Sequence, residues 1–459
     1  MRQDSMTSTE RKVALSLAGV FASRMLGLFL ILPVFSLYAR ELTGYTATLA
    51  GIALGIYGLT QAIFQIPLGM LSDMIGRKPV IVGGLLVFAL GSVVAAVSTS
   101  VYGVILGRAL QGAGAVASAV MALAADLTRE EHRIKVMALI GISIGLSFAV
   151  AMVLGPVLHE WFGVPGIFWT TSILALGGIA ITLFFVPRPV ICRFHRDTEV
   201  ELSWFRHAVM DKQLLRANFG IFSLHAILMG TFLVVPQLLH LQGHLDVSRH
   251  WQIYLPVMFL AMILIVPFIL LAEKKRMIKQ TLSVAVGLLM LTELGLAELS
   301  GTMAALVIML LLFFTAFNLL EAMLPSLVAK LAPAAHKGTA MGVYASSQFL
   351  GIFTGGLVGG WVMQHFGLQS VFIFNALLAG FWLLLAITMH KPQYLTSQLL
   401  NVGLLEEAAA SQLALKLSRI TGVAEATVIA EDGVAYLKVD KQRLDHDALL
   451  AFSVTENAA

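Results

Sequence analysis

The feature that most constrains this chain is a series of long apolar stretches joined by short polar ones. Each stretch is about 20 residues or longer, which is the length a helix needs to cross a bilayer. Only 12% of the 459 residues are charged, about half the usual share in soluble proteins. The predicted fold class is therefore an all-α polytopic membrane protein. Twelve spans are expected, at 13–39, 47–71, 79–98, 101–125, 135–161, 166–186, 215–241, 251–272, 280–299, 302–327, 338–362 and 369–389.

The distribution of Lys and Arg predicts the orientation. Twelve crossings place both termini on one side of the membrane. The loops on that side hold seventeen Lys and Arg residues, whereas the opposite loops hold only Arg40 and Arg249. The positive-inside rule then makes both termini cytoplasmic. The first apolar stretch is too long for a cleaved signal peptide, and we expect it to be a retained helix.

The chain divides into two similar halves and a soluble end. Pro67 and Asp73 have counterparts 200 residues later in Pro267 and Glu273, and paired six-helix halves are a recurring plan of transporters. Between the halves, "SWFRHAVMDKQLLR" predicts an amphipathic helix on the membrane surface, and an unstructured linker is the alternative. The expected units are 1–186, the linker 187–214, 215–390 and 391–459.

The last unit has the composition of a soluble domain. "VAEATVIA" and "VAYLKV" alternate apolar and polar residues around Asp432-Gly433, which predicts a hairpin. A helical pattern precedes the hairpin and a short one follows it. The predicted order of strand, helix, hairpin and helix describes a small α+β domain on the cytoplasmic side.

Charged residues inside spans cost about 2.5–3.5 kcal/mol each, even on the lenient scale. Arg24 lies about three turns into the first span, and Arg108 lies in the fourth with Gln111 on the same face. Each guanidinium either donates to backbone carbonyls where helices pack or faces a central cavity. Both alternatives stay open at this point.

Polar residues also recur at helical spacing in both halves. In lipid such stripes must face protein or water. They serve either helix–helix hydrogen bonding or a polar route between the halves, and the second accounts better for their presence in both. The candidates for this central cavity are Tyr57, Gln61, Asn218, His225, Asn318, Tyr344 and Gln348, together with Arg24, Arg108 and Gln111.

Two residues are candidates for proton coupling. Glu321 is a carboxylate well inside a span, and His225 is a histidine, the residue type whose unperturbed pKa lies near neutral pH. Glu293 and Glu298 lie nearer the outer end of their span and rank lower. No carboxylate is placed mid-membrane in the first six spans.

The sequence contains no motif for catalysis or for ATP hydrolysis. HExxH, GxSxG and GxxxxGK[ST] patterns are absent. The single cysteine, Cys192, excludes an intrachain disulfide and a cysteine-based metal site. We therefore expect neither an enzyme nor a metal or other cofactor. A gradient, or a separate ATPase subunit, would supply the energy.

The stretch "GMLSDMIGRKPV", Gly69 to Val80, joins the second and third spans. Orientation alone accounts for Arg77 and Lys78 but not for the acid or the glycines. Gly69 and Gly76 suit close helix approach and a tight turn. The Asp73 carboxylate is expected to interact with the partial positive charge at the N-terminus of the third span.

This stretch resembles the signature loop of the major facilitator superfamily, at Gly69, Asp73, Gly76, Arg77 and Lys78. "RALQGAG" (108–114) resembles the family's fourth-span motif, and Asp126 and Arg133 match the acid and base around the next cytoplasmic loop. Gly145, Gly155 and Pro156 resemble the fifth-span motif of drug/proton antiporters. The resemblance covers residues 13–390.

Several positions depart from the antiporter pattern. His159 and Glu160 stand where the fifth-span motif usually has glycines, and Arg24 occupies the helix in which several drug antiporters carry an acid. In the second half Ile269 and Arg276 replace the glycines of the signature loop. The last domain is similar to ferredoxin-like, heavy-metal-associated modules, but it lacks their cysteines, which argues against metal transfer.

The resemblance implies a bacterial inner-membrane transporter in which the halves rock around a central site. Gly69, Asp73, Gly76, Arg77, Lys78, Asp126 and Arg133, here called the latch residues, would hold the cytoplasmic ends together in the outward-open state. The implied activity is proton-coupled efflux of small amphipathic molecules. The alternatives are a metabolite symporter and a nontransporting sensor that signals through residues 391–459. Expected partners are a small-molecule substrate, the lipid bilayer and a protein or second copy at 391–459, without nucleic acid.

Overall fold

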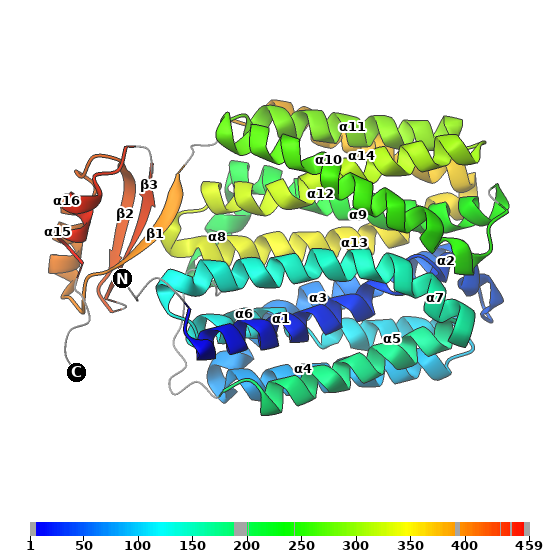
Figure 1. The fold of residues 1–459 in the computed structure, drawn as a ribbon, viewed down its shortest axis with the longest axis horizontal. Helices are drawn as coiled ribbons and strands as arrows, with labels where there is room; N and C mark the ends of the chain where they lie inside the picture. The colour runs from blue at the N-terminus through cyan, green and yellow to red at the C-terminus, as the bar shows by residue number, and fades with distance from the viewer. Residues whose placement is uncertain are drawn as a thin grey trace.

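The computed structural model describes residues 6–187, 200, 202–242, 244–390, 395–431, 433–440 and 443–453. A bundle of long helices carries a small domain of strands and helices at one end (Figure 1). We call the end of the bundle that bears this domain the domain end, and the opposite end, at α2, the distal end. All spatial statements below concern the described residues.

The first half of the bundle is built from helices of very different lengths. Its elements are α1 (Ser8–Phe29), α2 (Phe35–Tyr38), η1 (Ala39–Glu41), α3 (Ala47–Ile75), α4 (Arg77–Val97), α5 (Val101–Ala113), α6 (Ala117–Asp126) and α7 (Glu130–Phe184). The predicted first span ends earlier than expected, because turns at 30–34 around Pro33 separate α1 from α2. The predicted fourth span is likewise divided into α5 and α6.

The second half follows a linker helix. Its elements are α8 (Leu202–Met210), α9 (Lys212–Leu241), η2 (Val247–Arg249), α10 (Trp251–Lys274), α11 (Ile278–Leu299), α12 (Met303–Leu331), η3 (Ala334–His336), α13 (Lys337–Phe366) and α14 (Leu368–Ile387). The linker forms a helix at α8, so the alternative of an unstructured linker is wrong there. Residues 188–199 of the linker lie outside the described residues.

Ten of the described helices are long and apolar enough to cross a membrane. Two of the predicted spans, 135–161 and 166–186, lie together in α7. This helix has 55 residues and is broken at Gly163, whose φ is +64°. The 30-residue α13 is long enough but too rich in glycine and polar residues to count among the ten. The predicted twelve crossings require both α7 segments and α13, so that number stays a prediction.

The helix starts are fixed locally by side-chain caps. The hydroxyl of Thr46 accepts a hydrogen bond from the N–H of Leu49 at 3.1 Å, and that of Ser100 accepts one from Gly103 at 3.2 Å. These bonds satisfy backbone donors that have no partner in the first turn of a helix. The caps therefore fix where α3 and α5 begin.

The two halves pack tightly toward the distal end. A Cβ atom on Gly51 of α3 would lie only 2.0 Å from the carbonyl oxygen of Gly356 in α13. Any side chain at this position would force the two helices apart, so glycine is required for the approach. Polar contacts join the halves nearby. Arg40 donates to the Gln237 side chain, and the Thr48 hydroxyl donates to Gln364 at 2.7 Å.

The C-terminal domain contains a three-stranded sheet within residues 395–453. Its elements are β1 (Thr396–Asn401), α15 (Glu407–Leu417), β2 (Val423–Ile429), β3 (Val434–Val439) and α16 (His446–Leu450). The sheet order is β1-β3-β2 and both pairs are antiparallel, with Leu399 opposite Tyr436 and Thr427 opposite the same residue. This is a split βαβ unit. The complete ferredoxin-like fold needs a fourth strand, which these residues do not contain.

Strand β3 is buried on both faces, and alternation along the strand explains why. Ala435, Leu437 and Val439 belong to the core that the sheet forms with α15 and α16. The intervening Val434 and Tyr436 pack with Ala335 of η3. The second face of the sheet is therefore docked on the connection between α12 and α13.

Polar and aromatic contacts add to this docking surface. The Lys438 ammonium donates to the backbone oxygen of Lys330 at 2.7 Å, and Arg276 pairs with Asp440 at 3.3 Å. Burial lowers the pKa of the Lys438 ammonium, and the hydrogen bond offsets part of that cost. From the linker side, Trp204 of α8 stacks on His336 with ring centroids 4.9 Å apart. Linker and C-terminal domain thus meet at η3.

Candidate functional site

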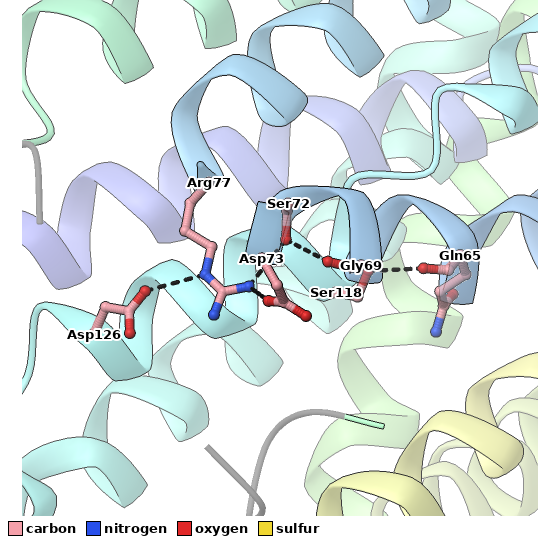
Figure 2. A network of polar contacts seen from close by, with 7 residues as sticks. All are labelled: Gln65, Gly69, Ser72, Asp73, Arg77, Ser118 and Asp126. Atoms are coloured by element: carbon pink, nitrogen blue, oxygen red, sulfur yellow. Dashed lines mark hydrogen bonds and ion pairs between the residues drawn. The ribbon is translucent and has the colours of Figure 1, made fainter. Parts of the chain in front are cut away.

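The turn between α3 and α4 holds a buried guanidinium at the domain end (Figure 2). Arg77 Nε donates to Asp126 Oδ2 at 3.1 Å, and Nη1 donates to Ser72 Oγ at 3.0 Å and to Asp73. The side chains of Arg77 and Asp126 are 1% and 0% exposed. One cation thereby joins the end of α3, the start of α4 and the end of α6.

The backbone of this turn depends on its glycines. Gly76 is the single residue between α3 and α4, with φ +98° and ψ 152°, a conformation that is essentially restricted to glycine. A Cβ on Gly69 would lie 3.0 Å from the hydroxyl oxygen of Ser118 in α6. Ser118 in turn donates to the backbone oxygen of Gln65 at 2.9 Å (Figure 2). The turn and the close helix approach expected here are both present.

Asp73 has a different local role from the one expected. It lies in the last turn of α3, and its carboxylate accepts from the Arg77 side chain. The residue at the N-cap of α4 is Gly76, which has no side chain to accept from the helix. Asp73 therefore orients Arg77 four residues later, and the expectation that it serves the N-terminus of the third span receives no support from a capping bond.

Of the remaining latch residues, Lys78 ties α4 to the end of α7. Lys78 Nζ donates to the backbone oxygen of Val186 at 2.7 Å, just beyond the end of α7, where carbonyl groups lack helical partners. Arg133 is buried near the start of α7. These contacts lie within the first half of the bundle. A role in holding the two halves together stays a prediction.

Two further guanidinium groups lie deep in the first half. Arg24 donates to the Gln61 side chain, and Arg108 Nη1 donates to Gln111 Oε1 at 2.8 Å. The Tyr57 ring lies beside both cations, 5.8 Å from the Arg24 guanidinium carbon and 5.2 Å from that of Arg108. Arg24 and Arg108 are 2% and 1% exposed. The structure thus joins the five polar positions predicted in this half into one cluster.

This cluster has both of the features considered from the sequence. Arg108 donates to the backbone oxygens of Ala53 and Leu54 at 3.4 Å each, which is a helix-packing contact with α3. Arg24 Nε and Nη1 have no hydrogen-bond partner among the described residues, and neither has the Tyr57 hydroxyl. Part of the donor capacity is therefore unused.

The second half holds an acid and a histidine in contact. His225 Nε2 lies 3.8 Å from Glu321 Oε2 and 2.8 Å from the Gln348 amide nitrogen. His225 Nδ1 lies 3.3 Å from the backbone oxygen of Ile221. A neutral imidazole fits these contacts, donating from Nδ1 and accepting at Nε2. Gln348 also donates to Glu321 Oε1 at 3.4 Å, so the three residues form one network across α9, α12 and α13.

Three other predicted positions stand outside this network. Tyr344 and Asn218 are buried and Asn318 is partly buried. Among the described residues, the Tyr344 hydroxyl, Asn218 Oδ1 and Asn318 Nδ2 have no hydrogen-bond partner. They lie on the same helices as His225, Glu321 and Gln348. The structure therefore places these residues in the second half without joining them by hydrogen bonds.

A small pocket is lined by one residue from each of the two polar clusters. Arg108 contributes to it from the first half and His225 from the second. The other lining residues are apolar: Leu28, Phe29, Leu32, Leu54, Leu228, Met229 and Ile352. Residues on α1, α3, α5, α9 and α13 thus meet at one place between the halves. Within the described residues, no group of three His, Cys, Asp or Glu side chains is arranged to hold a metal ion.

Of the fifth-span motif, only part has a packing role that the structure explains. A Cβ on Gly155 would lie 2.5 Å from the backbone oxygen of Leu30, at the break between α1 and α2. Pro156 lies inside α7. A Cβ on Gly145 would meet nothing within 4 Å, so close packing does not explain that glycine.

The sequence ranking missed a buried carboxylate cluster in the second half. Glu293 is 0% exposed. It lies 2.8 Å from the Thr231 hydroxyl and 3.1 Å from the Asn375 amide nitrogen. Its depth along α11 is visible in the sequence, but the two partners come from α9 and α14. Only the fold brings these partners together.

A second missed feature is the contact of Arg40 with Gln237 at the distal end. Arg40 was conspicuous as one of two bases on the side poor in positive charge. Its position on that side is the sequence signal for a contact, because the positive-inside rule does not explain a base there. The partner, in α9 of the other half, has no sequence signal.

Comparison with known proteins gives a consistent result. The sequence profile described as Major Facilitator Superfamily matches residues 17–356 and 319–416. The chain is 47% identical over 443 residues to the inner membrane transport protein YajR of Escherichia coli, covering 96% of this chain and 97% of that protein. It is 26% identical over 351 residues to the multidrug resistance protein MdtH of Aeromonas salmonicida, covering 75% of this chain and 86% of that protein.

Solved structures show the same fold. A bacterial homologue of the human lysosomal transporter Spinster, in an inward-facing and occupied conformation, superposes with a TM-score of 0.68 at 12% identity. The match covers 84% of this chain and 98% of the other. At this identity the likeness concerns the fold alone.

Proposed function

The chain belongs to the major facilitator superfamily, and from that premise we propose that it exports small amphipathic molecules in exchange for protons by alternating access. It is a membrane transporter and not an enzyme. The proposal places it in a bacterial inner membrane with both termini, and hence the domain end, in the cytoplasm. The proton gradient is the proposed energy source, and no cofactor takes part.

One observation supports this proposal above the others. The pocket between the halves is lined by Arg108 from one half and His225 from the other. Alternating access requires a central site that both halves share, because rocking of the halves then exposes it to one side at a time. The relative named as a multidrug resistance protein favours export.

Glu321 and His225 are the proposed proton carriers. They lie in contact at the level of the pocket, and each changes its charge when it gains a proton. An ionisable pair inside a membrane protein is by default a candidate for a functional site. Protonation of either group alters its attraction to the other and to Gln348, which gives the proton a means to bias the two conformations.

The latch residues are the proposed conformational element. In the outward-open state they hold the domain end closed, with Arg77 and Asp126 as the central pair. Removing one partner of a buried ion pair of this kind costs about 3–5 kcal/mol of stability. An energy of that size shifts a two-state equilibrium by more than a hundredfold.

The test of coupling is transport in proteoliposomes with and without an imposed pH gradient. Glu321→Gln is expected to abolish gradient-driven transport while leaving counterflow, because counterflow needs no net proton movement. Glu298→Gln is the matched control, since Glu298 is exposed on α11. Transport that does not respond to the gradient in the unaltered protein would refute the coupling.

Two alternatives make different predictions. A symporter would accumulate substrate together with protons, so the direction of gradient-driven flux separates it from an antiporter. A nontransporting sensor is favoured by the docked C-terminal domain, whose strand β3 contacts η3 between α12 and α13. Counterflow of any substrate would exclude the sensor.

A further inference from the structure

Two positive charges in the first half of the bundle have no internal counter-charge. In residues 13–125 the only acids are Glu41 and Asp73. One lies in η1 at the distal end and the other in the last turn of α3. Within the described residues, neither Arg24 nor Arg108 pairs with a carboxylate. Buried charges in proteins are ordinarily paired.

Unused hydrogen-bond donors remain in this cluster, on Arg24 and on Tyr57. Arg24 Nε and Nη1 and the Tyr57 hydroxyl have no partner, although Arg24 is 2% exposed and Tyr57 is 0% exposed. The Tyr57 ring lies close to both guanidinium groups, with its centroid 5.8 Å from the Arg24 guanidinium carbon and 5.2 Å from that of Arg108. A planar guanidinium with free N–H groups matches the oxygens of a carboxylate, sulfonate or phosphate.

The surroundings of the cluster are apolar and aromatic. Phe29 lines the pocket beside Arg108 and meets Phe148 edge to face, with ring centroids 5.1 Å apart. The ring centroid of Phe148 in α7 lies in turn 6.1 Å from that of Phe317 and 6.3 Å from that of Phe232, both in the other half. This aromatic group crosses the interface between the halves. It suits the apolar or aromatic body of a ligand.

We infer that the transported substrate is an amphipathic organic anion whose charged group accepts hydrogen bonds from Arg24 and is attracted by the charge of Arg108, and whose apolar body packs on Phe29 and Phe148. The inference rests on the proposed transport function, because it names the substrate class of that central site. A cationic substrate would meet two like charges. The acid of the site, Glu321, lies across the interface and contacts His225 and Gln348.

The experiment measures ligand binding to the purified full-length protein in detergent. The probes are aryl acetates with one, two and three fused rings, each beside its uncharged acetamide and the corresponding arylmethylammonium. A ligand that binds the native state raises the thermal midpoint with its concentration. We expect at least one acetate to bind ten times or more tightly than its acetamide, with no binding of the cation.

Variants locate the charge preference. Arg24→Gln and Arg108→Gln are each expected to weaken acetate binding about ten- to a hundredfold and to leave acetamide binding unchanged. Arg249→Gln changes the net charge equally at an exposed position and is expected to have no effect. If a glutamine variant fails to fold, Arg24→Lys serves instead. It keeps the charge and is expected to retain the preference for the anion while binding it more weakly.

Three results would overturn the inference: equal binding of acetate and acetamide, tighter binding of the cation, or no binding by any acetate of the series. The proposed function fails separately. An acetate that binds as expected but is not carried by a pH gradient in proteoliposomes would contradict coupled transport and leave the anion site standing. If a pH gradient drove transport of only the neutral or cationic probes, the anion site would be contradicted and coupled transport would stand.

Discussion

The turns α3–α4 and α10–α11 occupy equivalent places in the two halves, 200 residues apart, yet they use their charges differently. Both turns contain a residue with positive φ, Gly76 at +98° and Arg276 at +54°. In the first turn, Arg77 is buried and pairs with the buried Asp126 and with Asp73, whose side chain is 36% exposed. In the second, Arg276 is 44% exposed and pairs with Asp440 of the C-terminal domain.

The shared backbone conformation and the different side-chain partners indicate separate roles for the positive-φ residue and for the basic residue. A left-handed residue is needed in both halves to reverse the chain between two long helices, and it is kept even where the glycine is lost. In the first turn, the basic residue belongs to an ion network with the buried Asp126 of α6. In the second turn, the basic residue contributes to docking the small domain.

The largest expected effect comes from breaking the buried network. Asp126→Ala leaves the Arg77 charge with less compensation in a site that excludes water. We expect the free energy of unfolding in mixed micelles to fall by about 3–5 kcal/mol. The matched change in the second turn, Asp440→Ala, removes a partly exposed pair and should cost no more than about 1 kcal/mol. Equal losses in the two variants would contradict the contrast between the turns.

A smaller effect is expected from the backbone of the first turn. Gly76→Ala places a Cβ in a conformation that strains any side chain, at a cost of about 1–3 kcal/mol. Gly83→Ala, about two helical turns further into α4, is the control, because a Cβ there meets nothing within 4 Å. It should be neutral or stabilise the protein by up to about 1 kcal/mol. If Gly76→Ala left the free energy of unfolding unchanged, the turn would relax without strain and the prediction would be wrong.

The smallest effect is the coupling across the second turn. A double-mutant cycle of Arg276→Ala and Asp440→Ala should give an interaction energy of about 0.2–1 kcal/mol. The same cycle on Arg77 and Asp126 should give several times more. The comparison uses thermal or denaturant unfolding of the full chain. An energy above about 2 kcal/mol in the second turn would mean that this pair, too, is a structural lock.

Much of this architecture is predictable from the sequence because membrane-spanning helices require long apolar stretches. Apolar length gives the spans, and charge asymmetry gives their expected orientation. Gly76 is predictable because a one-residue turn needs a positive φ. Helical spacing also places Tyr57 and Gln61 on one face of their helix, and the structure brings Arg24 of the first helix to them.

Partners contributed by distant helices could not be predicted in the same way. Spacing along α11 gives the depth of Glu293 but not its neighbours Thr231 and Asn375. The Asp73 prediction came from its position near a helix start, whereas the long Arg77 side chain reaches back to that carboxylate. The docking of Tyr436 on η3 depends on which face of a short sheet is left uncovered, and a single strand sequence does not determine this.

The central claim, that the latch residues control the conformation of the halves, is tested most directly by distances across the domain end. Spin labels at Met74 and Lys274 occupy exposed equivalent positions in the two halves, in a Cys192→Ser background. Asp126→Asn should shift the distance distribution toward longer values by weakening the closed domain end, and Asp440→Asn should leave it unchanged. Identical distributions in the unaltered protein and in Asp126→Asn would contradict the account.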